Sequence, residues 1–453
     1  MLFDPFTIRN VTFKNRIIRS SIGGKTSYYD GTVSPAWQHF ERRFAERGVA
    51  ALVSPTISVH DRRWSPLNYP KISDDRFIAP IREGVAGVQA HDCRYILQIG
   101  DPGGHTQMSL LPEAVDAKSA SAGFDLVFGY RSTITAMSVD EIEQAVANFG
   151  AAARRVREAG CDGVEVTASK GYLIHQFLNP ATNRRTDAYG GSVDKRFRLL
   201  REICAAVRRE AGDDFLFGVR LSAVDNYALP VNLRWPPAFR LGRYRHGNGL
   251  PETLHYGHEL KALGVDYLHI SSGYGFINPT ESPGAWPVDA FRLYANATAH
   301  LSAKARVRAM LVGLPAPVVR AVFGLGWHVR PAGNAAYAKI FRDEVGLPVI
   351  ANGGFESRGG IEAALTAGQC DLVAMARPLL ANPDLVRQFE RGIDLPERPC
   401  THCNRCSVAT AVLPLGCYDP SRFESQEAME AQVVAWSSPD GAGGESGGVL
   451  PGA

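Results

Sequence analysis

The sequence lacks the features of membrane, secreted and fibrous proteins. No uninterrupted apolar run reaches the roughly 18 residues that a membrane-spanning helix needs, and the longest candidate, Ala309 to Val319, is flanked by Arg308 and Arg320. The first residues, MLFDPFTIRN, lack a basic segment followed by an apolar one, so we expect no signal peptide and a cytoplasmic protein. The 45 glycines and 28 prolines follow no fixed period, which excludes a collagen-like fibre.

Excess charge is also missing. The 49 Lys and Arg residues nearly balance 46 Asp and Glu residues, and the net charge of +3 is too small to indicate a nucleic-acid partner. Hydrophobic residues make up 45% and charged residues 21%, which is the composition of a folded globular chain. At about 150 residues per domain, 453 residues allow up to three domains, but one large barrel with appendages fits as well.

The chain contains eight cysteines, which without a secretion signal indicate reduced thiols or metal ligands rather than disulfides. Four of them form a ladder with the spacing Cys400-x2-Cys403-x2-Cys406-x10-Cys417. This spacing can bind one [4Fe–4S] cluster or a structural Zn²⁺ ion, and four free thiols are the third alternative. The scattered cysteines, which we expect to pack in the core, are Cys93, Cys161, Cys204 and Cys370.

Short apolar runs alternate with helical patterns along most of the chain. The runs are mostly continuous, as expected for parallel strands that are buried on both faces. Eight β–α units predict an α/β fold, a closed (β/α)8 TIM barrel, with an open doubly wound sheet as the alternative. The predicted strands are 17–21, 50–54, 95–99, 163–167, 216–221, 266–271, 348–351 and 372–376. The predicted helices are 35–47, 139–159, 193–211, 253–263, 335–345, 359–367 and 383–391, with 74–91 as a weaker eighth.

Two segments are too long to be simple connecting loops: 225–249 after the fifth strand and 274–333 after the sixth. Within the second, 305–327 is apolar with basic edges, and Pro315 and Pro317 predict two short helices with a bend. Because this insertion starts on the active-site face of a barrel, we expect a helical lid or wall that favours a bulky apolar substrate. Peripheral membrane contact and a dimer contact are the alternatives. The predicted parts are a barrel at 1–395, a cysteine-rich segment at 396–420 and a tail at 421–453, disordered from about 437.

Barrels carry their chemistry on the loops that follow the strands. Gly353 and Gly354, after the seventh strand, let backbone N–H groups approach a ligand without an intervening Cβ, and Ala376 and Arg377 follow the eighth. Barrels often bind phosphate at these two loops, although two tight turns would give the same pattern. Other unusual residues at the predicted strand ends are Gln98, Thr167, Lys170, Tyr172 and Arg220.

A series of ordered motifs between residue 1 and about residue 420 resembles the old yellow enzyme family. The motifs are Phe13–Ile17, Gln98, Gly171–Leu178, Asn183–Asp187, Tyr189–Ser192 and Met375–Leu380. The resemblance implies a TIM barrel that binds FMN and accepts hydride from NADH or NADPH. It also implies that Gln98 and Arg220 contact the pyrimidine side of the flavin. The residues that it places around the FMN phosphate are Gly353, Gly354, Ala376 and Arg377.

The catalytic loop departs from that family. Thr167 and Lys170 stand where old yellow enzymes usually carry two His, or His and Asn, to hold the substrate's carbonyl oxygen. Lys170 can attract an enolate-like oxygen by its charge, with a plain salt bridge as the alternative. Tyr172 matches the proton donor of old yellow enzymes and of the similar 2,4-dienoyl-CoA reductases, with a buried core tyrosine as the alternative. Gly23 stands where the family often has Thr or Cys near the flavin.

The resemblance therefore implies an FMN-dependent oxidoreductase that transfers hydride from NAD(P)H to an activated C=C bond of an enoate or dienoyl thioester. The alternatives are an amine or C–H dehydrogenase that passes electrons to a partner, and a non-enzymatic flavin or iron–sulfur electron carrier. Dienoyl-CoA reductases and trimethylamine dehydrogenases carry a similar cysteine ladder that holds [4Fe–4S]. Since no Gly-x-Gly-x-x-Gly motif opens a second nucleotide-binding domain, we expect such a cluster to require a separate electron-transfer partner, and an oligomer is possible.

Overall fold

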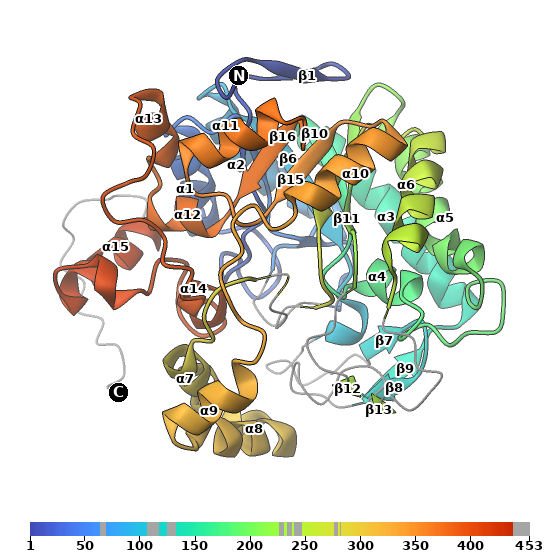
Figure 1. Cartoon of the computed structure of the whole chain (residues 1–453). Coiled ribbons are helices and arrows are strands. Elements are labelled where there is room, and N and C mark those ends of the chain that lie inside the picture. Colours follow the sequence, from blue (N-terminus) through green and yellow to red (C-terminus); the bar gives the residue numbers. More distant parts are fainter. Residues whose placement is uncertain are drawn as a thin grey trace.

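Eight parallel strands close into a barrel in the computed structural model (Figure 1). The described residues are 1–63, 69–106, 117–124, 133–225, 231–232, 238–239, 247–275, 280 and 282–437. The strands follow in the order β3 (Ile17–Arg19), β4 (Ala51–Val53), β6 (Arg94–Gly100), β10 (Gly163–Ala168), β11 (Leu216–Ser222), β14 (Tyr267–Ser271), β15 (Val349–Asn352) and β16 (Leu372–Met375). Because β16 pairs with β3, the sheet is closed, so the TIM barrel is confirmed and the open-sheet alternative is wrong.

Helices surround the barrel at the predicted positions. The helices are α1 (Pro35–Ala45), α2 (Ile78–Gln89), α3 (Val139–Glu158), α5 (Val193–Ala211), α6 (Leu250–Ala262), α10 (Ala335–Val345), α11 (Arg358–Thr366) and α13 (Leu385–Glu390). Serine side chains fix several of the starts, since Ser138 accepts a hydrogen bond from the backbone N–H of Glu141 and Ser192 accepts one from that of Lys195. The Glu141 side chain in turn accepts a hydrogen bond from the Ser138 backbone N–H, which completes a capping box.

One end of the barrel is closed by a hairpin of β1 (Phe6–Ile8) and β2 (Val11–Phe13). Ile8, Val11 and Phe13 pack with strand residues such as Ile18 and Ile350 in one buried cluster. A second and larger cluster fills the space between the strands and the helices and includes the four scattered cysteines. Since the hairpin occupies the amino ends of the strands, ligands can approach only from the carboxyl ends, on the opposite side in Figure 1.

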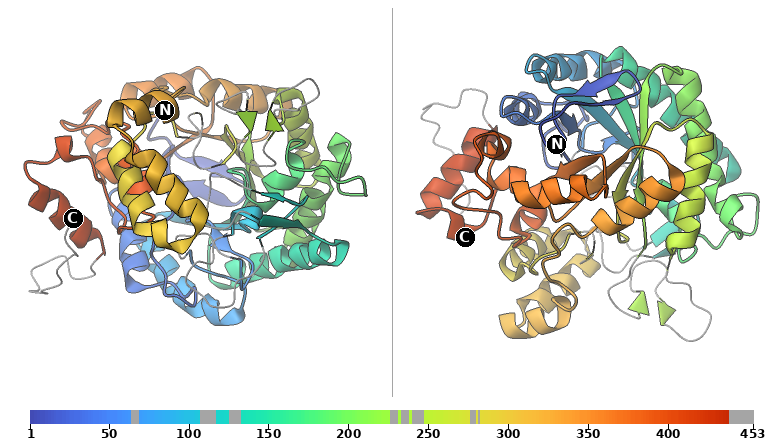
Figure 2. Two further views of the ribbon diagram at one scale, coloured as in Figure 1. Left: turned by 90° about the horizontal axis from the view of Figure 1, so that it is seen from below. Right: turned by 45° about the horizontal axis from the view of Figure 1, so that its top comes forward.

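The insertion after β14 forms α7 (Val288–Thr298), α8 (Ala303–Gly313) and α9 (Ala316–Phe323) at that open end (Figures 1 and 2). Pro315 separates α8 from α9, as predicted, because proline cannot continue a helix. Of the segment 225–249, only β12 (Val231–Asn232), β13 (Ala238–Phe239) and the two ends fall within the described residues. The predicted disorder from about residue 437 lies outside the described residues, but the tail begins with α15 (Gln426–Ser437).

Shorter elements complete the architecture. They are β5 (Ile57–Ser58), β7 (Ala117–Ser119), β8 (Gly123–Phe124), β9 (Thr133–Ala136), α4 (Leu173–Leu178), α12 (Arg377–Ala381) and α14 (Arg405–Ala409), with 3-10 turns at Asp75–Phe77, Gly103–His105, Ala299–Leu301 and Pro420–Arg422. In the described part of the chain, no helix combines the length and the apolar character needed to cross a bilayer.

Candidate active site

A cavity of about 240 Å³ opens at the carboxyl ends of the barrel strands. Strand ends, the α7–α9 insertion and the cysteine-rich segment all contribute to its wall. Among the described residues that line it, none is Asp or Glu, so the cavity favours a negatively charged ligand. The predicted site residues that it brings together are Lys170, Arg220, Gly353, Gly354, Ala376 and Arg377.

The two glycines after β15 need conformations that other residues rarely adopt. Gly353 has φ 102° and Gly354 has φ 79°. A Cβ at Gly354 would collide with the Arg330 carbonyl, and the Ala332 N–H donates to the Gly354 carbonyl at 2.8 Å. At Gly354 the backbone is therefore packed too closely for a side chain. The two glycines line the cavity with backbone alone.

Arg377 ties three parts of the chain together beside these glycines. Its Nη1 donates to the Pro283 carbonyl and to Asn404 Oδ1, both at 2.6 Å. These bonds hold the start of the insertion and the cysteine-rich segment against the barrel. Part of the guanidinium is thus used for structure, a role that the sequence did not indicate.

Arg220 is only 1% exposed and sits in β11 between Thr167 of β10 and His269 of β14 in register. A buried carboxylate, Glu165, lies in the neighbouring strand. It accepts hydrogen bonds from Gln98 Nε2 at 2.7 Å and His269 Nδ1 at 2.9 Å. Burial alone raises the pKa of Glu165, but the charge and hydrogen bond of His269, the charge of Arg220 and the Gln98 bond outweigh it and lower that pKa.

Gln98 also belongs to this network. The Gln98 side chain does not line the cavity; its amide donates to Glu165, and its oxygen accepts from the Thr56 hydroxyl. Glu165 and His269 were missed in the sequence, although a charged residue inside an apolar parallel strand was a usable signal, because burying it is costly unless a partner is present.

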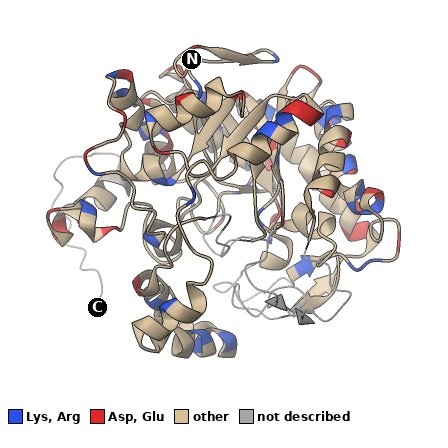
Figure 3. Cartoon of the chain, in the orientation of Figure 1, with Lys and Arg blue, Asp and Glu red and all other residues tan. Residues whose placement is uncertain are grey.

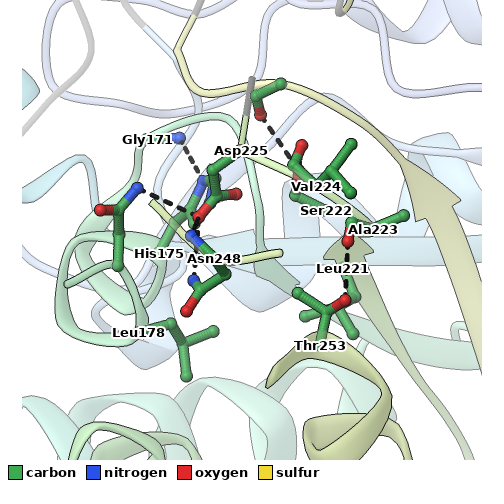
Figure 4. A network of polar contacts seen from close by, with 12 residues as sticks. Gly171, His175, Leu178, Leu221, Ser222, Ala223, Val224, Asp225, Asn248 and Thr253 are labelled. Atoms are coloured by element: carbon green, nitrogen blue, oxygen red, sulfur yellow. Dashed lines mark hydrogen bonds and ion pairs between the residues drawn. The ribbon is translucent and has the colours of Figure 1, made fainter. Parts of the chain in front are cut away.

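The loop that carries Lys170 and Tyr172 is fixed from behind by a second buried network (Figure 4). The Gly171 N–H donates to His175 Nδ1 at 3.0 Å, so the proton of this ring lies on Nε2 and is donated to Asp225 at 2.6 Å. Asp225 also accepts bonds from Asn179 Nδ2 at 3.1 Å and from the Asn248 N–H and side chain, both at 2.9 Å. These contacts hold the loop in one conformation, with Lys170 at φ 59° and Gly171 at φ 73°.

Of the three residues predicted to be catalytic, Lys170 lines the cavity, and Thr167 and Tyr172 do not. Both of the latter are buried. A Cβ built on Gly100 would lie 2.6 Å from Thr167 Cγ2 and 3.8 Å from Tyr172 Cδ2, so the two side chains lie together over the end of β6.

Tyr69 is a cavity residue that the sequence analysis missed. It lines the cavity, and its hydroxyl occupies the place that a Cβ on Gly23 would take. The only available signal was the absence of a side chain at Gly23, and nothing in the sequence shows which residue fills the space.

The insertion contributes an aromatic wall. Phe291, Tyr294 and Trp327 line the cavity, and so does Arg308, whose guanidinium lies 4.7 Å from the centre of the Tyr294 ring. The aliphatic residues on which the predicted wall was based do not form it. Exposed side chains include Val307, Met310, Leu311, Leu314, Val318 and Val322, because α8 and α9 turn this face to solvent.

The four cysteines of the ladder line one smaller cavity, which shares Arg377, Leu380, Asn404 and Cys406 with the large one. Arg422 Nη1 donates to Cys417 Sγ at 3.2 Å, and burial raises the pKa of the Cys406 thiol to about 12. In the part of the chain that the structure describes, no three His, Cys, Asp or Glu side chains are arranged to hold a metal ion. The ladder therefore gathers in space without forming a complete ligand set.

Comparisons with known sequences indicate a family. A family model for the NADH:flavin oxidoreductase / NADH oxidase family matches residues 1–230 and 304–396. A metal reductase of Desulforamulus reducens is 28% identical over 406 residues, which is 89% of this chain and 51% of the relative. An NADPH dehydrogenase of Halalkalibacterium halodurans is 28% identical over 387 residues, 84% of this chain and 91% of the relative. The chain spans about half the length of some relatives and most of others.

Solved structures show the same fold. A 2-naphthoyl-CoA reductase in complex with 2-naphthoyl-CoA has a TM-score of 0.70 and 23% identity and matches 90% of this chain and 55% of its own. Morphinone reductase in complex with tetrahydroNAD has a TM-score of 0.63 and 22% identity and matches 89% and 93%.

Replacing Gly171 tests whether the loop conformation is as tightly constrained as the geometry indicates. In Gly171→Ala, the new Cβ would lie 2.6 Å from His105 Cε1 and would be held in a left-handed conformation. We expect the free energy of unfolding to fall by about 2 to 5 kcal/mol, measured by urea denaturation. Gly160→Ala is the matched control, since Gly160 has φ 79° with nothing within 4 Å, and should lose only about 1 to 2 kcal/mol. Equal losses in the two variants would contradict the constraint.

Proposed function

The chain belongs to the NADH:flavin oxidoreductase / NADH oxidase family, and from that premise we propose that it is an FMN-dependent enzyme that moves hydride from NAD(P)H to an activated C=C bond. The observation that carries the proposal is a single cavity that combines Arg220, Lys170 and the two late loops without any carboxylate among its described lining residues. Membership of an oxidoreductase family identifies the chain as an enzyme, which removes the non-enzymatic carrier. No described residue favours the amine or C–H dehydrogenase.

The residues of the cavity fit FMN. Gly353, Gly354 and the Ala376–Arg377 step offer open backbone for the phosphate, and Arg220 offers a positive charge for the pyrimidine side of the ring. A dianionic phosphate meets no carboxylate among the described lining residues, so its binding is not opposed by like charge. The chemistry that bound FMN supplies is hydride transfer between a nicotinamide and a second substrate.

The remaining cavity residues support an apolar or acyl-type substrate that carries a carbonyl oxygen. Phe291, Tyr294 and Trp327 provide an aromatic wall, which suits an apolar conjugated group. Lys170 lines the cavity from the loop that also carries Tyr172, so we assign its ammonium to the substrate oxygen. Its ammonium would stabilise negative charge that develops on that oxygen.

Tyr172 is the proton donor in this proposal. It is two residues from Lys170 in the loop that His175 and Asp225 fix, so the two groups keep a constant relation to each other. Tyr69 is the competing phenol, because it lines the cavity directly. The two tyrosines can be separated by experiment.

Stopped-flow spectroscopy of the FMN-loaded protein tests these roles. Lys170→Met and Tyr172→Phe should each slow oxidation of the reduced enzyme by an enone or enoyl thioester by about 100-fold or more. Reduction by NADH or NADPH should change little, since neither group acts in that half-reaction. Tyr69→Phe is the matched control. A large loss in Tyr69→Phe with none in Tyr172→Phe would move the proton donor to Tyr69, and loss of reduction alone would contradict the role of Lys170.

We also propose that the cysteine ladder binds a [4Fe–4S] cluster, which would exchange electrons with a separate partner protein. The supporting observation is that all four thiols line one cavity and that Cys406 also lines the large one. Hydrogen bonds to the sulfurs from Arg422 and from the His402 N–H, at 3.2 and 3.4 Å, are of the kind that tune such clusters. Because the side chains do not form a complete ligand set, we derive no electron-transfer step through them.

Metal analysis of anaerobically purified protein decides this point. We expect about four iron atoms and four acid-labile sulfides per chain, lost in Cys406→Ala and kept in Cys161→Ala, whose cysteine is buried far from the ladder in sequence. One zinc ion without sulfide, or no metal at all, would contradict the cluster. Neither outcome would affect the flavin proposal, which depends on other residues.

A further inference from the structure

The outer face of α8 and α9 carries apolar side chains that the described part of the chain does not cover. On α8, Val307, Met310, Leu311 and Leu314 follow the i, i+3, i+4, i+7 spacing of one helix face. Val318 and Val322 on α9, with Leu325 just beyond it, continue the pattern at i, i+4, i+7. We call these seven residues the outer stripe.

The outer stripe is unusual because a surface helix normally turns its apolar face inward. Met310 is 74% exposed, Val322 and Leu325 are each 59% exposed, and Val307 is 54% exposed. The inward side of the same helices is occupied by the buried residues Ala305, Val312 and Val319. The pair therefore packs on α7 and presents a second set of apolar residues to the outside.

The charges around the outer stripe have one sign. Residues 290–342 contain no Asp or Glu, and no part of the α8 or α9 ribbon has the red of acidic residues in Figure 3. Arg306 and Arg320 are exposed, and within the described residues neither makes an ion pair. The basic residues of this stretch that belong to the insertion are Arg292, Lys304, Arg306, Arg308, Arg320 and Arg330.

The position of the outer stripe connects it with the cavity. α7, α8 and α9 lie at the open end of the barrel, away from the β1–β2 hairpin (Figures 1 and 2). The same insertion supplies Phe291, Tyr294, Arg308 and Trp327 to the cavity wall. One side of the insertion thus borders the site, and the other faces outward beside its entrance.

We propose that the outer stripe docks on the surface of an anionic phospholipid membrane. The apolar side chains enter the boundary of the acyl chains, and Arg306 and Arg320 lie at the level of the headgroup phosphates. A second copy of the chain fits less well, because a two-fold contact through this face would bring basic residues together without acidic partners. Docking places the cavity entrance at the membrane, where apolar substrates are concentrated.

Vesicle flotation of the purified full-length protein tests the proposal. The protein should float with phosphatidylcholine vesicles that contain 30% phosphatidylglycerol and should remain free with phosphatidylcholine alone. Arg306→Glu/Arg320→Glu should weaken binding by about tenfold or more, because each basic residue near an anionic surface contributes roughly fivefold. Met310→Ser/Val322→Ser should weaken it by a similar factor, since two apolar side chains no longer insert.

Matched controls carry equivalent changes elsewhere. Arg209→Glu on α5 and Val434→Ser on α15 alter exposed residues outside the insertion and should leave binding unchanged. Absence of binding to anionic vesicles would overturn the proposal. Vesicle binding that is unchanged in Met310→Ser/Val322→Ser would also overturn the proposal, since only non-specific charge attraction would remain. If light scattering shows dimers and Met310→Ser/Val322→Ser dissociates them, the face would be assigned to a second copy instead. None of these outcomes depends on the flavin proposal, because NAD(P)H oxidation in solution is a separate measurement.

Discussion

Arg220 is a cation buried among the barrel strands, and the nearby Glu165 carboxylate on the neighbouring strand interacts favourably with its charge. Leaving such a group without its partner would cost about 3 to 5 kcal/mol. The interaction depends on the register of β6, β10, β11 and β14, which sets Gln98, Glu165, Arg220 and His269 across adjoining strands. Closure of the barrel, the buried polar network and the positive cavity mouth therefore stabilise one another.

The site is assembled from parts that serve different needs. Gly353 and Gly354 provide backbone without side chains, and the Lys170 loop provides a charge in a conformation that His175 and Asp225 maintain. The insertion provides aromatic side chains on one face and an apolar, basic-edged surface on the other. The barrel itself is a scaffold that many functions share, so we expect substrate preference to depend mainly on the insertion and the Lys170 loop.

The sequence predicted the barrel well because its strands are continuous apolar runs that alternate with helical patterns. It also placed Gly353 and Gly354 correctly in the cavity wall, since paired glycines after a strand indicate close approach of the backbone. It did not predict that Gln98 would donate a hydrogen bond to Glu165, because this contact depends on which residues of adjoining strands lie side by side.

The orientation of α8 and α9 could not be predicted from the sequence either. Apolar residues surround much of α8 and α9, so the periodicity of 305–327 does not show which side faces the barrel, and the expected aliphatic wall was assigned to the wrong face. Tyr69 reaches Gly23 from a distant part of the chain, and no local pattern indicates such a contact. The cysteine spacing indicated that the four thiols would gather, but not the arrangement of their side chains.

The most direct test of the central claim is titration of flavin-free protein with FMN and with riboflavin, followed by flavin fluorescence. If the late loops bind the phosphate, one FMN should bind per chain, and riboflavin, which lacks the phosphate, should bind at least about tenfold more weakly. Absence of FMN binding, or equal affinity for the two flavins, would contradict the account.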